Sequence, residues 1–258
     1  KLGVGPDKEV PAYSPSGLFK PGAENGVAMT QADIDEVVAS FAQAALDAKN
    51  IGFDAIEVHG AHGYLVDQFF WQGTNQRDDQ YGGSLKNRTR FGVEIVQAIR
   101  AAVGEDFTII FRFSQWKQQD YSAKLCQTPE ELGIFLGLLS DAGVDVFHAS
   151  TRRFWVSEFE GSDLNLAGWT KKLTDKPVIT VGNVGLDADF IGEGNKDLSG
   201  TSNPTGIEEL LERLGNNEFD LVAIGRALLV DPDWVNKIGV NAIEEIKPFT
   251  KKSLMSLS

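Results

Sequence analysis

The sequence predicts an α/β protein in which helices cover a parallel sheet. Five short apolar runs that read as strands alternate with stretches of helical periodicity. These runs are apolar on both faces, as expected for strands that are buried beneath helices on either side. The length of 258 residues and the 42% hydrophobic content are enough to bury a substantial core.

The elements follow in order after an unusual start. Residues 1–29 are rich in Gly and Pro and show no regular period, so they predict an irregular arm without strands. Thr30 is predicted to cap the first helix, because Asp33 completes a capping-box pattern. Strands are predicted at 53–59, 107–114, 144–150, 177–183 and 220–225, and further helices at 85–103, 129–142, 167–173, 206–214 and 232–238.

The number of strands limits the architecture. A closed (β/α)8 barrel needs eight strands and typically about 250 residues. The length fits such a barrel but the five predicted strands do not, and no linker divides the chain into two domains. Two interpretations remain: an open sheet of five strands, or a barrel that lacks its beginning.

Composition excludes several classes of protein. The formal net charge of -13 repels phosphate backbones and anionic lipid surfaces, so nucleic acid and membrane partners are disfavoured. Cys126 is the single cysteine, which excludes an internal disulfide, a cysteine zinc cage and a cysteine-ligated iron–sulfur cluster on this chain alone. No apolar run is long enough to cross a bilayer and no signal-peptide core is visible, so a cytoplasmic location is expected.

The first strand leads into three polar side chains, His59, His62 and Tyr64. Ligands of parallel α/β proteins gather where strands end. Two imidazoles at this spacing can donate hydrogen bonds to one oxygen, and a nearby phenol can supply a proton. A His-x-x-His metal pair is the competing interpretation.

Arg112 lies within the apolar second strand, where a charge needs a polar partner. That partner is either a carboxylate such as Glu57 or a bound anion or polarised cofactor ring. Two late strands end in Gly182-Asn183 and in Gly225-Arg226. Accessible backbone N–H groups and an arginine at this place predict a phosphate site.

Other polar and aromatic segments have less specific interpretations. Residues 75–91 form a long polar stretch with Arg and Asp side chains, which predicts a loop held rigidly by salt bridges, with a positioning role beside the His pair as the alternative. Aromatic residues in loops that follow strands suggest a cavity for a flat ligand; they are Trp71, Trp116, Phe154 and Trp155. Cys126 and His148 are expected to be packing residues, His148 without a visible partner.

Together these motifs resemble the Old Yellow Enzyme family of FMN-dependent NAD(P)H:flavin oxidoreductases. The similarity rests on two long motifs, which begin at His59 and Asn75, and on shorter ones at Phe111-Arg112-Phe113-Ser114, Gly182-Asn183 and Gly225-Arg226. It covers only the later part of a family member. It implies one FMN-binding (β/α)8 TIM-barrel domain over residues 1–258, carrying the family's strands 4 to 8, with the first three βα units missing.

The resemblance also implies a role for each candidate residue. His59 and His62 would hydrogen-bond the carbonyl or nitro oxygen of an activated alkene, with Trp116 beside the substrate. Tyr64 would protonate the α-carbon while hydride passes from flavin N5 to the β-carbon. Arg112 would lie against the pyrimidine edge of FMN. The FMN phosphate would be held by Gly182, Asn183, Gly225 and Arg226.

The expected reductant is NADH or NADPH, and the expected partner is a small alkene or carbonyl substrate. A homo-oligomer and a separately supplied N-terminal segment are both left open as further partners. No metal is expected at the site. Two alternatives remain: a metal-dependent hydrolase that uses His59 and His62 but lacks an obvious third ligand, and a fragment that is not catalytic.

Overall fold

The computed structural model describes residues 12–187 and 203–255. It divides into two compact units. The first unit comprises Lys1–Ala149 and Thr170–Pro177, and the second comprises Ser150–Trp169 and Val178–Ser258. None of the helices within the described residues is both long enough and apolar enough to span a membrane.

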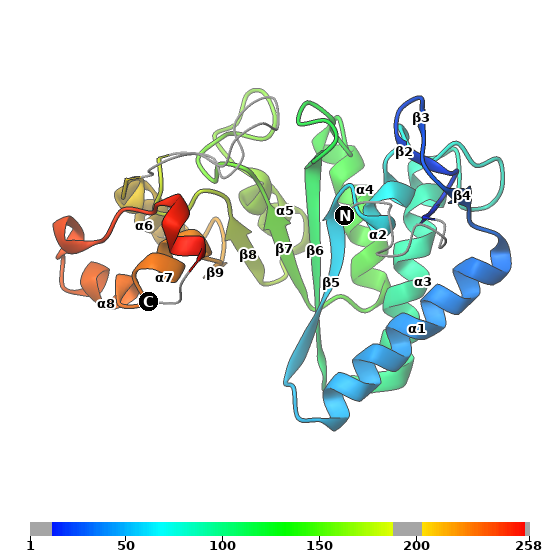
Figure 1. The fold of residues 1–258 in the computed structure, drawn as a ribbon, viewed down its shortest axis with the longest axis horizontal. Helices are drawn as coiled ribbons and strands as arrows, with labels where there is room; N and C mark the ends of the chain where they lie inside the picture. The colour runs from blue at the N-terminus through cyan, green and yellow to red at the C-terminus, as the bar shows by residue number, and fades with distance from the viewer. Residues whose placement is uncertain (1–11, 188–202, 256–258) are drawn as a thin grey trace. The chain divides into compact units, whose positions relative to one another are not determined.

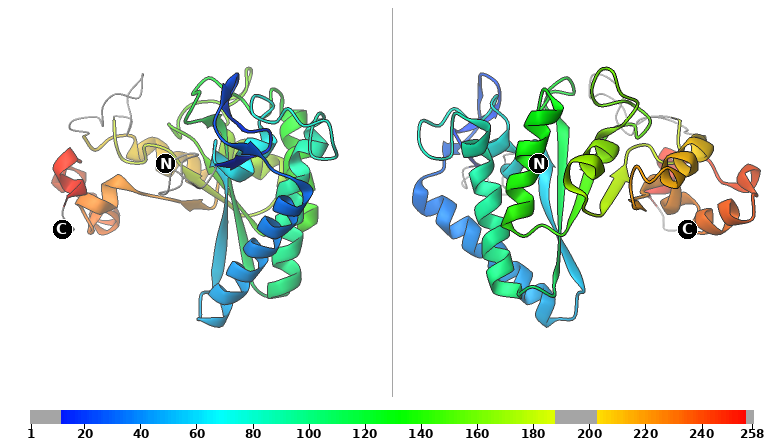
Figure 2. Two further views of the ribbon diagram at one scale, coloured as in Figure 1. Left: turned by 45° about the vertical axis from the view of Figure 1, so that its right-hand side comes forward. Right: turned by 180° about the vertical axis from the view of Figure 1, so that it is seen from behind.

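The first unit is built on parallel strands, as predicted. Strand β6 (Thr108–Lys117) lies between β5 (Ala55–His62) and β7 (Val146–Ser150) and pairs with both in parallel register. Helix α3 (Leu85–Val103) contacts both α1 (Gln31–Asn50) and α4 (Pro129–Ala142). Figures 1 and 2 show these helices side by side along one side of the strands.

The two faces of this sheet have different characters, because side chains alternate along a strand. Phe111 and Phe113 on β6 are fully buried on the side of the helices. The Phe113 ring is 5.7 Å from that of Phe135 on α4, and the Phe111 ring is 6.2 Å from that of Phe70. Arg112, between the two phenylalanines, therefore points to the opposite face.

Local sequence signals set the ends of the main helices. The capping box predicted for α1 is present, with Thr30 and Asp33 bonding each other's backbone N–H groups. Helices α3 and α4 have the bounds predicted from the sequence. Each ends before a glycine with positive φ, Gly104 at 78° and Gly143 at 117°, which L-residues with a Cβ rarely adopt.

Some elements differ from the prediction. Strand β5 continues to His62, beyond the predicted end at residue 59. A glycine allows this extension, because a Cβ on Gly60 would lie 2.6 Å from the Phe111 ring. Helices α2 (Leu65–Phe70) and α7 (Arg226–Val230) were not predicted. Each is under two turns long, which is too short for a periodic pattern to register.

The prediction that the arm contains no strand is wrong for its described part. Strand β1 (Tyr13–Ser14) pairs in parallel with β4 (Val27–Ala28), and β2 (Leu18–Lys20) pairs antiparallel with β3 (Ala23–Glu24). Strands of two or three residues are too short to show alternation, so the sequence pattern could not reveal them. Residues 1–11 of the arm lie outside the described residues.

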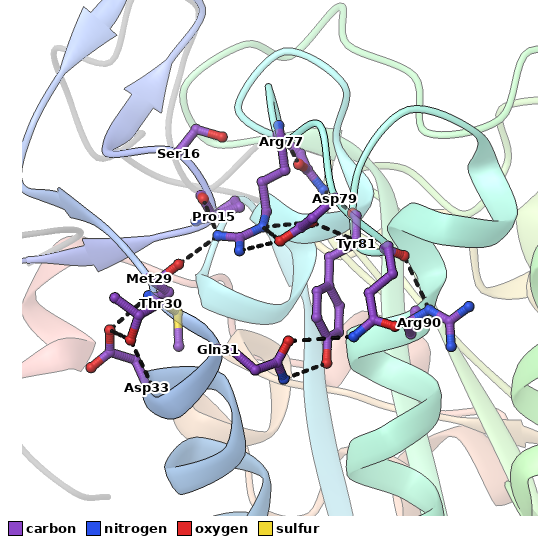
Figure 3. Close-up of polar contacts among 12 residues, drawn as sticks. Pro15, Ser16, Met29, Thr30, Gln31, Asp33, Arg77, Asp79, Tyr81 and Arg90 are labelled. Carbon is purple, nitrogen blue, oxygen red and sulfur yellow. Dashed lines mark hydrogen bonds and ion pairs between the residues drawn. The ribbon is translucent and has the colours of Figure 1, made fainter.

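The loop after α2 ties this arm to the rest of the unit, as Figure 3 shows. Arg77 Nη1 donates to the carbonyl oxygens of Pro15 at 2.8 Å and Met29 at 2.6 Å. Its guanidinium also pairs with Asp79. Tyr81 receives a hydrogen bond from Gln31 at 3.0 Å. Within residues 75–91, the structure thus contains one ion pair between Arg and Asp side chains of the kind predicted, Arg77–Asp79.

The second unit holds a parallel pair of strands, β8 (Val178–Val181) and β9 (Leu221–Val222). Both are shorter than the predicted runs. The ends of helix α5 (Leu166–Thr174) fall in different units. The other elements of the second unit are α6 (Ile207–Gly215), α7, α8 (Trp234–Gly239) and the 3-10 turns η1 (Ile243–Glu245) and η2 (Lys251–Leu254).

The Arg77 contacts predict a measurable effect on stability. Replacing Arg77 with Met leaves two carbonyl oxygens without their charged donor and should lower the free energy of unfolding by about 2 kcal/mol. Urea denaturation measures this change. Arg90→Met is the matched control, because Arg90 makes one exposed contact, with the Gln80 carbonyl. An equal loss of unfolding free energy in the two variants would show that the Arg77 contacts with the arm do not stabilise the protein.

Candidate active site

The three predicted side chains at the end of β5 lie together. The ring centroids of His59 and His62 are 5.1 Å apart, and those of His59 and Tyr64 are 5.2 Å apart. Tyr64 directly precedes α2 and is 38% exposed, so its hydroxyl group is on an accessible side chain. The structure therefore brings two imidazoles and a phenol into one cluster.

The backbone between these side chains makes a tight turn. His62 and Gly63 have φ values of 65° and 78°, both in the left-handed region. Two contacts hold the turn. The His62 N–H donates to Ser114 Oγ on β6 at 2.9 Å, and the side chain of Gln119, which follows β6, donates to the Gly63 carbonyl at 3.1 Å. Such contacts offset the cost of an unfavourable φ at a residue other than glycine.

A buried ion pair lies directly beneath this turn. Lys117 Nζ is 2.6 Å from Asp67 Oδ1, and both side chains are fully buried. The second carboxylate oxygen of Asp67 accepts the Gly63 N–H at 2.7 Å. Burial raises the pKa of Asp67, although Lys117 and the Gly63 N–H act in the opposite direction. The pair thus connects β6 and α2 to the turn that carries His62 and Tyr64.

Arg112 lies next to His59 on the face away from the helices. The β5–β6 register places His59 opposite Arg112, and the β6–β7 register places Arg112 opposite His148. His148 Nδ1 is 2.6 Å from Glu57 Oε2. The expectation that His148 has no partner is therefore wrong. It arose because Glu57 and His148 are 91 residues apart in the sequence.

The electrostatics keep both catalytic candidates on β5 neutral. Burial, and then the charge of Arg112, lower the pKa of His59. The same two causes, with smaller effects from His59 and Lys117, lower the pKa of His62 to about 3. A neutral imidazole has one N–H donor and one acceptor nitrogen. At neutral pH the two rings can each donate a hydrogen bond without carrying a charge.

The predicted aromatic residues have different surroundings. The Trp116 ring stacks on His62 at 4.6 Å between centroids. Trp71 is buried at the end of α2, so it is a core residue rather than the wall of a pocket. Phe154 and Trp155 belong to the second unit, where their rings meet at 5.2 Å. A cavity shared by all four aromatics stays a prediction.

The predicted phosphate-binding residues form a separate group within the second unit. Arg226 follows Gly225 at the start of α7, and its Nη2 donates to Asn183 Oδ1 at 2.5 Å. Asn183 has a φ of 47° and follows Gly182, whose φ is 147°. The Arg226 guanidinium also lies 5.3 Å from the ring centre of the buried Phe249. The structure thus brings Asn183 and Arg226 together, while their phosphate-binding role stays a prediction.

The described residues contain no cluster that could hold a metal ion, and the cysteine side chain is buried. Within 12–187 and 203–255, no three His, Cys, Asp or Glu side chains gather closely enough to hold a metal ion. The hydrolase alternative thus gains no third ligand there. Cys126 is fully buried, and Gln115 bonds to both its backbone N–H and its carbonyl.

Sequence reasoning missed Asp67, Lys117 and Ser114, which support the site. One signal was available: Lys117 lies at the end of a strand that is otherwise rich in buried apolar residues. A lysine in such a place requires an anionic partner. The sequence did not indicate which carboxylate that would be, because Asp67 is 50 residues away.

Comparison with known proteins gives a consistent result. The model of a family described as NADH:flavin oxidoreductase / NADH oxidase matches residues 5–245. An NADH oxidase of Thermoanaerobacter brockii is 37% identical over 227 residues, which are 85% of this chain and 31% of that protein. An NADPH dehydrogenase of Clostridium acetobutylicum is 34% identical over 225 residues, which are 86% of this chain and 60% of that protein.

A solved structure is similar as well. Morphinone reductase in complex with tetrahydroNAD superposes with a TM-score of 0.70 at 26% sequence identity, and the match covers 92% of this chain and 61% of that chain. The chain thus spans less than two thirds of the length of each of these three relatives.

The ion pair beneath the turn predicts a large effect of a single substitution. Lys117→Met leaves the Asp67 carboxylate buried without its partner and should lower the free energy of unfolding by about 3–5 kcal/mol. Adding Asp67→Asn should recover part of this loss, because it removes the buried charge and keeps an acceptor for Gly63. Urea denaturation measures both variants. Lys86→Met, at an exposed lysine, is the control, and a loss no larger than the control's would refute the prediction.

The low pKa of His62 predicts how stability depends on pH. Below about pH 6.5 the unfolded chain binds a proton at this residue, whereas the folded protein does so only near pH 3. The contribution of His62 to the free energy of unfolding is thus complete above pH 6.5. It declines by up to about 1.4 kcal/mol per pH unit as the pH falls towards 3. His62→Asn removes the titrating group, so the wild type should lose more stability than the variant between pH 7 and 4. Urea denaturation measures the free energy of unfolding at each pH. The same loss between pH 7 and 4 in both proteins would contradict the low pKa of His62.

Proposed function

Because the chain belongs to the NADH:flavin oxidoreductase / NADH oxidase family, we propose that it passes hydride from NADH or NADPH, through FMN, to an activated alkene. The observation that carries the proposal is the cluster of His59, His62 and Tyr64 next to Arg112. Two neutral donors and a phenol suit the polarisation and protonation of an alkene that is conjugated to a carbonyl or nitro group.

The motif resemblance to the Old Yellow Enzyme family is confirmed by the family match and by the similarity to morphinone reductase. The predicted α/β class is that of the family's TIM barrel. We propose further that the five βα units correspond to units 4 to 8 of that barrel and belong to one FMN-binding domain. The parallel order of the strands in each unit and the 61% coverage of morphinone reductase support this finer assignment.

The donor set of the described residues fits FMN. Arg112 lies on the face of the sheet that carries His59 and would hold the polar edge of the flavin ring. Gly182, Asn183, Gly225 and Arg226 would hold the phosphate, with Asn183 orienting the Arg226 guanidinium. When bound, FMN supplies the hydride-transfer chemistry that no amino-acid side chain provides.

The remaining chemistry falls to the residues of the turn. His59 and His62 each direct a neutral N–H at the substrate oxygen, where negative charge develops during reduction. The Tyr64 hydroxyl delivers a proton to the α-carbon. The stacking of Trp116 on His62 fixes the plane of that ring and gives the substrate a flat apolar contact.

Flavin binding tests the proposal directly. The protein is titrated with FMN, and quenching of flavin fluorescence is measured, followed by NADPH oxidation with and without cyclohexenone. Saturable binding and enone-dependent oxidation are expected. A chain that binds no FMN, even when residues for the first three barrel strands are supplied, would overturn the proposal.

The role of Tyr64 predicts a selective defect. In Tyr64→Phe, reoxidation of the reduced flavin by the alkene should slow by about 100-fold or more, because only this half-reaction needs the proton. Reduction by NADPH should change little. Stopped-flow absorbance separates the two half-reactions. Tyr121→Phe, which removes a hydroxyl from a ring 5.7 Å from Trp116, is the matched control, and equal slowing of both half-reactions in Tyr64→Phe would rule out the proton-donor role.

A further inference from the structure

Strand β6 bulges next to the proposed active site. Gly60 is opposite Phe113 in the β5–β6 register. The next pair in register is His62 and Lys117, so two steps along β5 (60 to 62) span four along β6 (113 to 117). Bulges occur often beside active sites, where they re-aim a side chain. The side chain that this bulge presents to the site is Trp116, whose ring stacks on His62.

Both neighbours of Trp116 in the chain are anchored by buried side chains. Lys117 is held by its ion pair with Asp67 on α2. Gln115 is 4% exposed and binds the backbone of Cys126. Its Nε2 donates to the Cys126 carbonyl at 2.9 Å, and its Oε1 accepts the Cys126 N–H at 2.8 Å. The partly exposed indole of Trp116 thus lies between two residues whose side chains are fixed in the interior.

The contact of Gln115 with Cys126 also closes the loop that follows β6. We call residues 116–125, which lie between these two residues, the β6 loop. Within it the backbone groups of Lys117 and Asp120 bond to each other at 3.1 Å in both directions, so the chain turns back on itself. Cys126 lies just before α4. Compact loops whose ends lie close together frequently carry functional residues.

The chemistry of an amide suits this closing contact. A glutamine side chain has both an acceptor oxygen and an NH2 donor, so it can pair with the N–H and the carbonyl of one residue at once. Both of these backbone groups belong to Cys126, which is fully buried. Buried backbone groups that lose their partners are costly. A side chain without an amide at position 115 would therefore open the β6 loop at its base.

We propose that Gln115 is a positioning residue of the proposed active site: by closing the β6 loop, it holds the Trp116 ring against His62. The inference rests on the proposed function, which places Trp116 beside the substrate. Ser114 acts in the same sense, because its Oγ donates to the Trp116 carbonyl at 2.8 Å. The N–H groups of an imidazole lie in the plane of its ring, so an indole stacked on the face of His62 does not block them.

The single cysteine of the chain reports whether Gln115 closes the loop. In the wild type the buried Cys126 thiol should react only slowly with Ellman's reagent under native conditions. Gln115→Met should raise this rate at least about tenfold, because the β6 loop then opens locally. A rate that stays at the wild-type value in this variant overturns the proposal.

Asn165→Leu is the matched control. The Asn165 amide also donates to a backbone carbonyl, that of Phe154, and accepts a backbone N–H, that of Gly168. All three residues belong to the second unit. The control should lose stability through the same kind of contact and leave the reactivity of Cys126 unchanged. If it exposes the thiol as much as Gln115→Met does, the effect is a general loss of stability and the proposal is refuted.

The ring of His62 reports whether the closed loop matters at the site. The chain has three histidines, so nitrogen NMR of ¹⁵N-histidine-labelled protein gives a simple spectrum. Burial is the largest cause of the low pKa of His62, so the wild-type ring should stay neutral between about pH 8 and 5. In Gln115→Met the uncovered ring should take up a proton within this range, whereas in Asn165→Leu it should not. An unchanged His62 titration in a Gln115→Met protein whose Cys126 has become reactive overturns the positioning role.

Steady-state kinetics separate this inference from the proposed function. In Gln115→Met the KM for cyclohexenone should rise about tenfold, the effect of losing one well-placed aromatic contact. The Kd for FMN should change little, because the β6 loop is not among the proposed flavin contacts. An unchanged KM overturns the inference and leaves the proposed function in place. A wild-type protein that binds no FMN contradicts the proposed function, whereas the Cys126 and His62 measurements still decide the positioning role.

A conservative variant completes the series. Gln115→Asn keeps the amide on a stem that is shorter by one methylene group, so its thiol reactivity, His62 titration and KM should lie between those of the wild type and Gln115→Met. If Gln115→Met does not fold, Gln115→Asn takes its place under the same criteria.

Discussion

The buried ion pair between Asp67 and Lys117 is the contact on which the geometry of the candidate active site depends. It joins the end of β6 to the first turn of α2, and Asp67 also holds the Gly63 N–H. Removing two charges from water is costly, so a fully enclosed pair of this kind is weak evidence for stability as such. Its value here is the fixed position that it gives to the turn, and with it to His62 and Tyr64, before any ligand arrives.

A second constraint is electrostatic. Arg112 is opposite His59 in the strand register. Burial, and then the charge of Arg112, lower the pKa of His59 and His62, so both imidazoles are neutral. Glu57, which also lies on β5, carries a negative charge that partly offsets the positive charge of Arg112. The face of the sheet away from the helices is therefore polar and organised, whereas the opposite face is a layer of packed phenylalanine rings. Both faces arise because successive side chains along each strand point to opposite sides of the sheet.

Local signals predicted the parts of this molecule that are determined locally. Helix α3 has the predicted bounds because Ser84 caps one end and Gly104 terminates the other. The cluster of His59, His62 and Tyr64 was predictable because its members are neighbours in the sequence. The Asp67–Lys117 and Glu57–His148 pairs were not, since they join residues that are 50 and 91 positions apart. Strand register brings such residues together, and sequence periodicity does not specify register.

The left-handed backbone at His62 also limits how this site can vary among related sequences or in engineered libraries. Few residues other than glycine adopt that conformation readily, and asparagine, aspartate and histidine are the main ones. Large aliphatic or β-branched side chains at position 62 would therefore strain the backbone. Variation at Trp116 would meet less resistance, because this residue stacks on the same ring but has no positive φ.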